Sequence, residues 1–428
     1  MSSTEAASPP SRLARKLGMG DAVVMGLGSM IGAGIFAALA PAARAAGSDL
    51  TIGLVVAALV AYCNATSSAA LAALYPESGG TYVYGRRRLN AFWGFLAGWG
   101  FVVGKLASCA AMALTFAYYA APAFARPLAV AAVVAMTAVN YFGVAKTALA
   151  TRAIVAVVLA CLAVVVFAAA FGGEADFARA RPALAAGAPG ILEAAGFLFF
   201  AFAGYARIAT LGEEVADPVR TIPRAIPLAL LITLAVYAAV AVSALLAVDA
   251  TTLAQASAPL VAAVESGRWA ALAPVVRIGA TVASLGVLLS LLAGVSRTAF
   301  AMAGNGDLPR LLASVHPRHR VPDHAELAAG AIVVAVVLVA DVRGAIGFSS
   351  FAVLVYYAIA NASALTLRPN ERRWPKVLAA GGLAGCVLLA ASLPLTSIAQ
   401  GGALLAAGAA LYALRRNRRC EKAGGGER

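Results

Sequence analysis

Long, mostly apolar runs recur along the whole chain, and this feature limits the possible folds more than any other. A run of about 20 such residues is long enough to cross the hydrocarbon core of a bilayer as a helix. Charged residues make up only 12% of the chain, whereas soluble proteins carry about 25%. No short apolar stretch with a small-residue cleavage site comes first, so we expect no removable signal peptide. The sequence therefore predicts an all-α polytopic membrane protein.

We expect about 12 transmembrane helices within one membrane domain, residues 18–414. Residues 1–17 form a tail before this domain. Residues 415–428 form a polar, basic tail after it, which we expect to be disordered. The predicted spans cover residues 21–46, 51–74, 91–120, 128–141, 154–171, 191–212, 226–248, 271–295, 327–340, 346–367, 377–393 and 398–414.

Lysine and arginine are distributed unevenly between the two sides of this predicted bundle. If the N-terminus is cytoplasmic, most of the 33 basic residues fall in cytoplasmic segments. This bias predicts a multi-pass protein of the inner (cytoplasmic) membrane with both termini in the cytoplasm. The net charge of +14 is then expected to face anionic lipid headgroups of the bilayer and not nucleic acid. The many alanines and arginines and the few lysines favour a bacterial source with a GC-rich genome.

Two of the predicted spans carry glycine-rich interruptions near their midpoints. Span 21–46 contains the stretch GLGSMIGAG, and each glycine costs a helix about 1 kcal/mol relative to alanine. Close packing of helices through small residues is one explanation. Span 191–212 has a glycine with flanking aromatic residues in FFAFAGY. Interrupted helices at matching positions of two repeats indicate a transporter binding site.

The two interrupted spans would each begin a repeat of five spans. The repeats are residues 18–171 and 190–367, and two further helices follow at 377–414. An odd number of crossings separates the interrupted spans, so the second repeat is expected to be inverted. Unwound backbone at membrane depth is tolerated where it lines a cavity. Its carbonyls can bind an ammonium group, and helix N-termini can bind a carboxylate, so the substrate is expected to be an amino acid.

Four motifs follow one another between residues 18 and 369: GSMIGAGIF, PESGGTYVYGRRR, FFAFAGYARIATLGEEVADPVRTIPRAI and RTAFAMAGNGDLPRLLASVHPRHRVP. Together they resemble the amino acid–polyamine–organocation (APC) permeases. The resemblance implies a five-plus-five inverted repeat of the leucine-transporter type, with broken helices 1 and 6, and transport by alternating access. It also implies that the substrate is bound by Ser29, Met30, Ile31, Gly32, Ala33, Gly34, Phe200, Ala201, Phe202, Ala203, Gly204 and Tyr205.

One lysine lies in the middle of a predicted span, where a charge is costly and indicates a function. This is Lys105, halfway along span 91–120. Many proton-coupled relatives in the APC group carry a lysine at the position of Val158, and Lys105 is a candidate to replace it in proton coupling. The alternative is that Lys105 bonds to unwound carbonyls. Arg207 stays protonated. It could bind a substrate anion or close an inner gate, but we expect an inner ion pair with Glu213, Glu214 or Asp21.

No carboxylate lies in the central part of any predicted span, so neutral or anionic amino acids are favoured over cations. We expect a secondary active transporter with a proton as co-substrate, although hydroxyls of Ser290 and Ser296 leave sodium coupling open. Neither a cofactor nor a metal site is expected, and no nucleophile–base pair suggests an enzyme. The alternatives are an exchanger (antiporter) for basic amino acids or polyamines and a passive channel, which needs a continuous polar lining.

Overall fold

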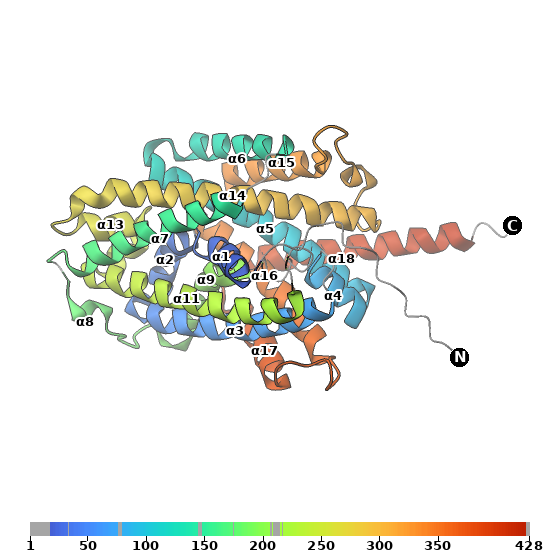
Figure 1. The fold of residues 1–428 in the computed structure, drawn as a ribbon, viewed down its shortest axis with the longest axis horizontal. Helices are drawn as coiled ribbons and strands as arrows, with labels where there is room; N and C mark the ends of the chain where they lie inside the picture. The colour runs from blue at the N-terminus through green and yellow to red at the C-terminus, as the bar shows by residue number, and fades with distance from the viewer. Residues whose placement is uncertain are drawn as a thin grey trace.

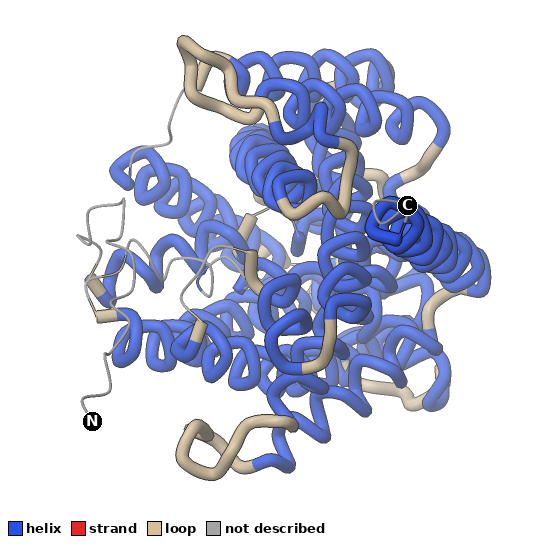
Figure 2. The backbone as a smooth tube through the Cα atoms, turned by 90° about the vertical axis from the view of Figure 1, so that its right-hand side faces the viewer, coloured by secondary structure: helices blue, strands red, loops and turns tan. Residues whose placement is uncertain are grey.

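The computed structural model describes residues 18–32, 34–75, 79–143, 148–173, 175–205, 208, 215 and 217–424. The regular elements within these residues are α-helices and short 3-10 helices, so the predicted all-α class is confirmed. Figure 1 shows a bundle in which most long helices run in a similar direction, and several of them are seen nearly end-on in Figure 2.

The helices follow one another along the chain with short connections. The α-helices and the 3-10 helices (η) are α1 (Met19–Met30), α2 (Gly34–Ala46), η1 (Gly47–Asp49), α3 (Leu50–Leu74), α4 (Thr81–Arg88), α5 (Ala91–Ala120), η2 (Pro122–Phe124), α6 (Ala125–Tyr141), α7 (Ala148–Ala170), α8 (Phe177–Ala180), α9 (Gly187–Phe202), η3 (Ala203–Tyr205), α11 (Pro218–Ala247), α12 (Ala250–Gln255), α13 (Pro259–Glu265), η4 (Ala270–Leu272), α14 (Ala273–Gly304), η5 (Arg310–Ala313), α15 (Asp323–Val339), α16 (Val342–Leu365), α17 (Lys376–Ser392) and α18 (Leu395–Gly424).

Nine helical segments of the described residues are long and apolar enough to cross a membrane, whereas the sequence predicted about 12. One of the three missing spans is explained by the first predicted span, because α1 is short and α2 is joined to α3 through η1 and counted with it as one segment, Gly34–Leu74. The other two missing spans correspond to α15 and α17, which have only 17 residues each. A perpendicular crossing needs about 20 residues.

Several helices extend beyond the ends that hydropathy predicted, and α14, α11 and α18 extend furthest. α14 continues to Gly304, so Arg297 lies inside this helix and not in the following loop. α11 begins at Pro218, where proline is compatible with the first turn of a helix. α18 continues to Gly424, so the predicted disorder of the basic tail is wrong over most of its length. Lysine and arginine are good helix formers, and extending an existing helix requires no new nucleus.

The packing places the interrupted helices in the middle of the bundle. α2 and α3 pack against α9, α1 packs against α7 and α11, and α5 packs along both α14 and α16. In Figure 1, α1 and α9 lie between α14 on one side and α3 on the other. The backbone at the two interruptions is therefore surrounded by protein, as the tolerance for unwound segments at membrane depth requires.

Candidate functional site

The first interruption separates α1 from α2. α1 ends at Met30 and α2 begins at Gly34, and Ile31 and Gly32 between them are not helical. Ala33 lies outside the described residues. A Cβ added to Gly34 would lie 2.7 Å from Cα of Ala201, so only glycine allows α2 to begin this close to α9.

The second interruption is the change from α9 to η3 after Phe202. It touches the first interruption through backbone atoms, because a Cβ added to Gly204 would lie 2.1 Å from the carbonyl oxygen of Ser29. The gap between α1 and α2 lies within the stretch GLGSMIGAG, and the change from α9 to η3 lies within FFAFAGY. Two segments separated by about 170 residues of sequence thus meet at one place in the structure.

Two tyrosine hydroxyls bind carbonyl groups at the interruptions. Tyr237 of α11 donates to the carbonyl oxygens of Met30 and, at 3.2 Å, of Ala201. Tyr357 of α16 donates to the carbonyl oxygen of Ala203 at 3.1 Å. Buried carbonyl groups need such partners, so these tyrosines compensate for helix hydrogen bonds lost at the interruptions. Sequence analysis missed both, although a tyrosine in the middle of an apolar span was an available signal.

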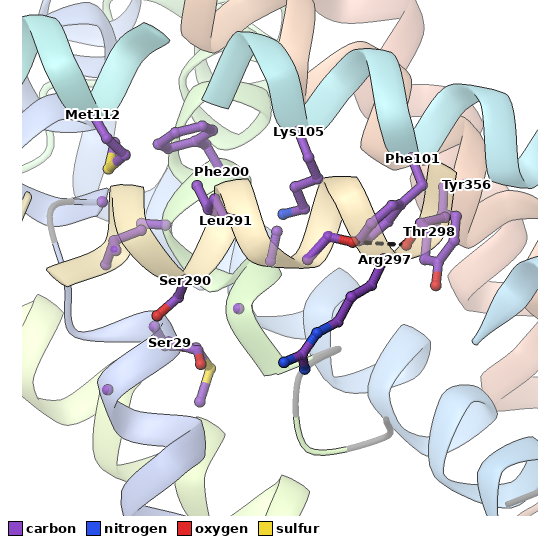
Figure 3. Close-up of a pocket in the computed structure, with 18 of the residues that line it drawn as sticks. Ser29, Phe101, Lys105, Met112, Phe200, Ser290, Leu291, Arg297, Thr298 and Tyr356 are labelled. Carbon is purple, nitrogen blue, oxygen red and sulfur yellow. Dashed lines mark hydrogen bonds between the residues drawn. The ribbon is translucent and has the colours of Figure 1, made fainter. Parts of the chain in front are cut away.

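A cavity of about 270 Å³ adjoins the two interruptions, and Figure 3 shows a close-up of its lining. We call it the central cavity. Its wall comes from α1, α2, α5, α9, η3, α14 and α16, together with residues near α4. The members of the predicted site that line it are Ser29, Met30, Gly34, Phe200, Ala201, Ala203 and Gly204.

The remaining predicted site residues lie elsewhere. Phe202 and Tyr205 have no exposed surface, and their rings pack on Tyr237 and Tyr357, respectively. Phe202 is still helical, and a side chain two positions beyond Phe200 points about 200° around the helix, away from the cavity. The two expected gate residues, Arg207 and Glu214, lie outside the described residues.

A second cavity of about 290 Å³ lies between α1, α6, α7 and α14. Ile31 and Gly32 of the predicted site line this cavity, and so does Val158. The position where the APC resemblance leads one to expect a lysine therefore faces open space beside α1, but it carries an apolar side chain. Ser29 and Ser290 border both cavities.

Two charged side chains line the central cavity among the described residues, and both are cationic: Lys105 and Arg297. Lys105 stands at the midpoint of α5, is only 8% exposed, and projects toward α14 in Figure 3. No described residue forms an ion pair or hydrogen bond with it. Arg297 also lines the second cavity. Hydropathy ended the predicted span just before this arginine, and so the sequence analysis placed it in a loop.

The other buried charged side chains of the described residues have partners. Asp49 accepts hydrogen bonds from the backbone N–H groups of Leu184 and Ala186. Glu326 accepts one from Asn140 at 2.9 Å. The described residues contain no cluster of three or more His, Cys, Asp or Glu side chains that could hold a metal ion. Lys105 is therefore unusual as a buried charge that lacks a partner and faces a cavity.

A buried aromatic contact lies beyond one end of the central cavity. Along α5 the lining ends at Met112, and Tyr119 lies two turns further on. The ring of Tyr119 packs edge-on against Phe36 at 5.6 Å between centroids. Its hydroxyl donates to the carbonyl of Phe36 at 3.2 Å and accepts from the backbone N–H of Leu260 at 3.4 Å. We call this the Tyr119 end.

The opposite end reaches Tyr82 of α4 and is surrounded by charged groups. The buried carboxylate of Asp307 accepts hydrogen bonds from the Tyr82 hydroxyl at 2.8 Å and from Arg86 at 2.7 Å. Asn305 also donates to the Tyr82 hydroxyl, and Arg415 of α18 donates to the carbonyl oxygen of Asp307 at 2.6 Å. We call this the Tyr82 end.

Comparison with known proteins gives a consistent group of relatives. The sequence model of a family described as amino acid permease matches residues 21–407. The chain is 64% identical over 407 residues to an uncharacterised transporter of Mycobacterium tuberculosis, covering 95% of this chain and 92% of the relative. It is 28% identical over 341 residues to the branched-chain amino acid permease BcaP of Bacillus subtilis, covering 74% and 73%. It is 27% identical over 392 residues to human cationic amino acid transporter 4, covering 83% and 60%.

Proposed function

The chain belongs to the amino acid permease family, and from this premise we propose that it is a secondary active transporter that carries amino acids across the cytoplasmic membrane by alternating access. The observation that carries the proposal is the meeting of two interrupted helices beside a cavity in the middle of the bundle. Paired interruptions of this kind supply both a carbonyl-rich and an N–H-rich helix end for a zwitterion.

The proposed binding mode uses the gap between α1 and α2. The end of α1 offers carbonyl groups for the substrate ammonium, and the start of α2 offers N–H groups for its carboxylate. Ser29 and Gly34 stand at these two helix ends and line the central cavity. Phe200 of α9 also lines the cavity and would cover the bound substrate as part of a gate.

The proposed topology has 12 crossings arranged as two inverted repeats, residues 18–171 and 190–367, with two further helices at 377–414. The interruptions near the start of each repeat support this arrangement, as does membership of the family. Both termini would be cytoplasmic, which the distribution of lysine and arginine supports. The Tyr82 end would then face the cytoplasm.

A passive channel is the less favoured alternative. A channel needs a continuous polar lining across the membrane, whereas the lining of the central cavity ends at Met112 along α5. The packed rings of Tyr119 and Phe36 lie two turns further on and would close this end. A cavity closed at one end and extending toward the other is what alternating access requires of each of its states. We infer that the structure represents the state that is open toward the Tyr82 end.

The charges of the lining favour neutral or anionic substrates. Two relatives are named for different substrates: one is a branched-chain amino acid permease and the other a cationic amino acid transporter. Lys105 and Arg297 are the charged residues of the described lining, and they would repel a basic side chain or a polyamine. This observation weighs against an exchanger for basic amino acids.

Proton coupling is proposed for Lys105. A lysine can release and regain a proton, whereas an arginine stays charged. Lys105 is buried in the middle of α5 and faces the central cavity. Gain of a proton and binding of a substrate beside it would therefore be linked, because each changes the electrostatic free energy of the other.

The test is uptake of a panel of labelled amino acids into proteoliposomes, with and without an inward proton gradient. We expect the gradient to drive uptake by the wild type and to lose its effect in Lys105→Ala. Lys105→Arg should still bind substrate but should not respond to the gradient. Lys376→Ala, which removes an exposed lysine at the start of α17, is the matched control. Uptake that does not depend on the proton gradient but requires amino acid inside the vesicle would instead indicate an exchanger.

A further inference from the structure

Arg297 lines both cavities, and the binding mode proposed above gives it no contact with the substrate. It lies on α14, two turns beyond Ser290. Seven residues of α-helix correspond to about 10 Å along the axis. In Figure 3 the guanidinium group extends from α14 on the side where Ser29 and Ser290 lie. A permanently charged group is thus directed toward the space beside the interruption between α1 and α2.

Arg297 forms no ion pair with a described residue. The carboxylate whose charge interacts with it is Glu326, which is only 2% exposed. That carboxylate is already hydrogen-bonded by Asn140 and Ser296. The described structure therefore leaves the hydrogen-bond donors of Arg297 available to a molecule in the cavity.

Lys105 lines the same cavity from α5, which packs against α14, and is also without a partner among the described residues. Arg297 is exposed, whereas Lys105 is buried, and a buried charge without a counter-charge is costly, so that proteins usually pair it. No acidic side chain belongs to the described lining. The missing negative charge would be supplied by the cavity's occupant.

We infer that the substrate is an amino acid with an acidic side chain and that Arg297 determines this specificity. This inference rests on the proposed transport function. The ammonium and carboxylate groups common to all amino acids would bind at the gap between α1 and α2. The second carboxylate would accept hydrogen bonds from Arg297, whose planar fork matches a carboxylate in two-point contact, with Lys105 as the second cation.

The test compares glutamate with glutamine, which has nearly the same shape but no side-chain charge. Proteoliposomes containing wild type, Arg297→Gln, Arg297→Lys or Arg310→Gln take up each labelled compound. Arg310→Gln is the matched control, because Arg310 is exposed in η5 and lines neither cavity. Size-exclusion profiles and melting temperatures identify any variant that fails to fold.

We expect the wild type to prefer glutamate or aspartate over glutamine, leucine and lysine. Arg297→Gln should raise the KM for glutamate about tenfold or more, since it removes a charge-assisted hydrogen bond. Its KM for glutamine should stay close to that of the wild type. Arg297→Lys should retain part of the preference for glutamate over glutamine, and Arg310→Gln should retain all of it.

Three results would overturn the inference. If the wild type transports leucine or glutamine and acidic amino acids neither compete nor enter, the substrate class is wrong but the transport function stands. If folded Arg297→Gln keeps the full preference for glutamate, Arg297 is not the specificity residue. If folded wild type neither transports nor is thermally stabilised by acidic, neutral or basic amino acids, the proposed function fails together with the inference.

Discussion

Different interactions stabilise the two ends of the central cavity. At the Tyr119 end, an aromatic ring packs against Phe36 and its hydroxyl bonds to backbone groups, all of them buried. At the Tyr82 end, Asp307 binds Arg86 and a tyrosine hydroxyl, and Arg86 is 33% exposed. Apolar packing scarcely depends on salt, whereas a partly exposed ion pair is weakened by it. The stability of the Tyr119 end therefore depends on the packing of apolar side chains, and that of the Tyr82 end depends on electrostatic attraction.

The largest effect is expected from removing the Tyr119 ring, which we infer closes the cavity. Tyr119→Ala should lower the free energy of unfolding by about 3–5 kcal/mol, because it leaves a cavity in the core. It should also connect the central cavity to the far side, so that preloaded amino acid leaks from proteoliposomes. Melting temperature in detergent and retention of label measure the two effects.

A more conservative change separates packing from hydrogen bonding at the same end. Tyr119→Phe keeps the ring and loses the bonds to Phe36 and Leu260, so it should cost only about 1 kcal/mol and cause no leak. If Tyr119→Phe destabilises the protein as much as Tyr119→Ala, hydrogen bonds and not ring packing stabilise the Tyr119 end. The proposed contrast between packing at this end and ion pairing at the Tyr82 end would then be wrong.

A smaller effect is expected at the Tyr82 end. Asp307→Asn leaves Arg86 without its ion-pair partner, and after screening by water the loss should be about 1 kcal/mol. The difference in melting temperature between wild type and this variant should narrow between about 0.05 M and about 1 M salt. The corresponding difference for Tyr119→Phe should not change. Equal salt dependence of the two differences would contradict the distinction between the ends.

Local sequence patterns predicted the features that depend on local chemistry. Glycine-rich stretches indicated both helix interruptions, and apolar runs indicated the helical class. The position of Lys105 halfway along a helix followed from the same runs, because a helix has a fixed rise per residue and its midpoint can be counted.

The sequence did not reveal features that depend on long-range packing. The hydroxyl of Tyr237 binds the carbonyl of Met30, 207 residues away, and no local pattern encodes that pairing. Arg297 was missed because a hydropathy window ends at a charge, whereas the helix continues as long as its backbone hydrogen bonds do. Phe202 was assigned to the site by the family resemblance, which does not say where α9 stops being helical.

The smallest effect concerns a contact that ties α4 to the loop between α16 and α17, also near the Tyr82 end. Arg88 binds Glu371 at 2.7 Å, and the hydrogen bond from Arg88 lowers the pKa of Glu371 to about 2. The folded pKa lies below the unfolded value of about 4.3. The contribution of this pair to stability is therefore present above about pH 4.3 and is lost as the pH falls toward 2.

Melting temperatures of wild type and Glu371→Gln, measured from neutral pH down to about pH 3, test this contact. The difference between the two proteins should be constant at neutral pH and should shrink below about pH 4.3, where Glu371 begins to take up its proton in the unfolded chain. Subtracting the variant isolates this carboxylate from the other acidic groups. Tyr119→Phe should show no such pH dependence, because the groups it affects do not titrate in this range. A difference between wild type and Glu371→Gln that persists unchanged to pH 3 would mean that charge does not hold α4 in place, which would weaken the assignment of the whole Tyr82 end to electrostatics.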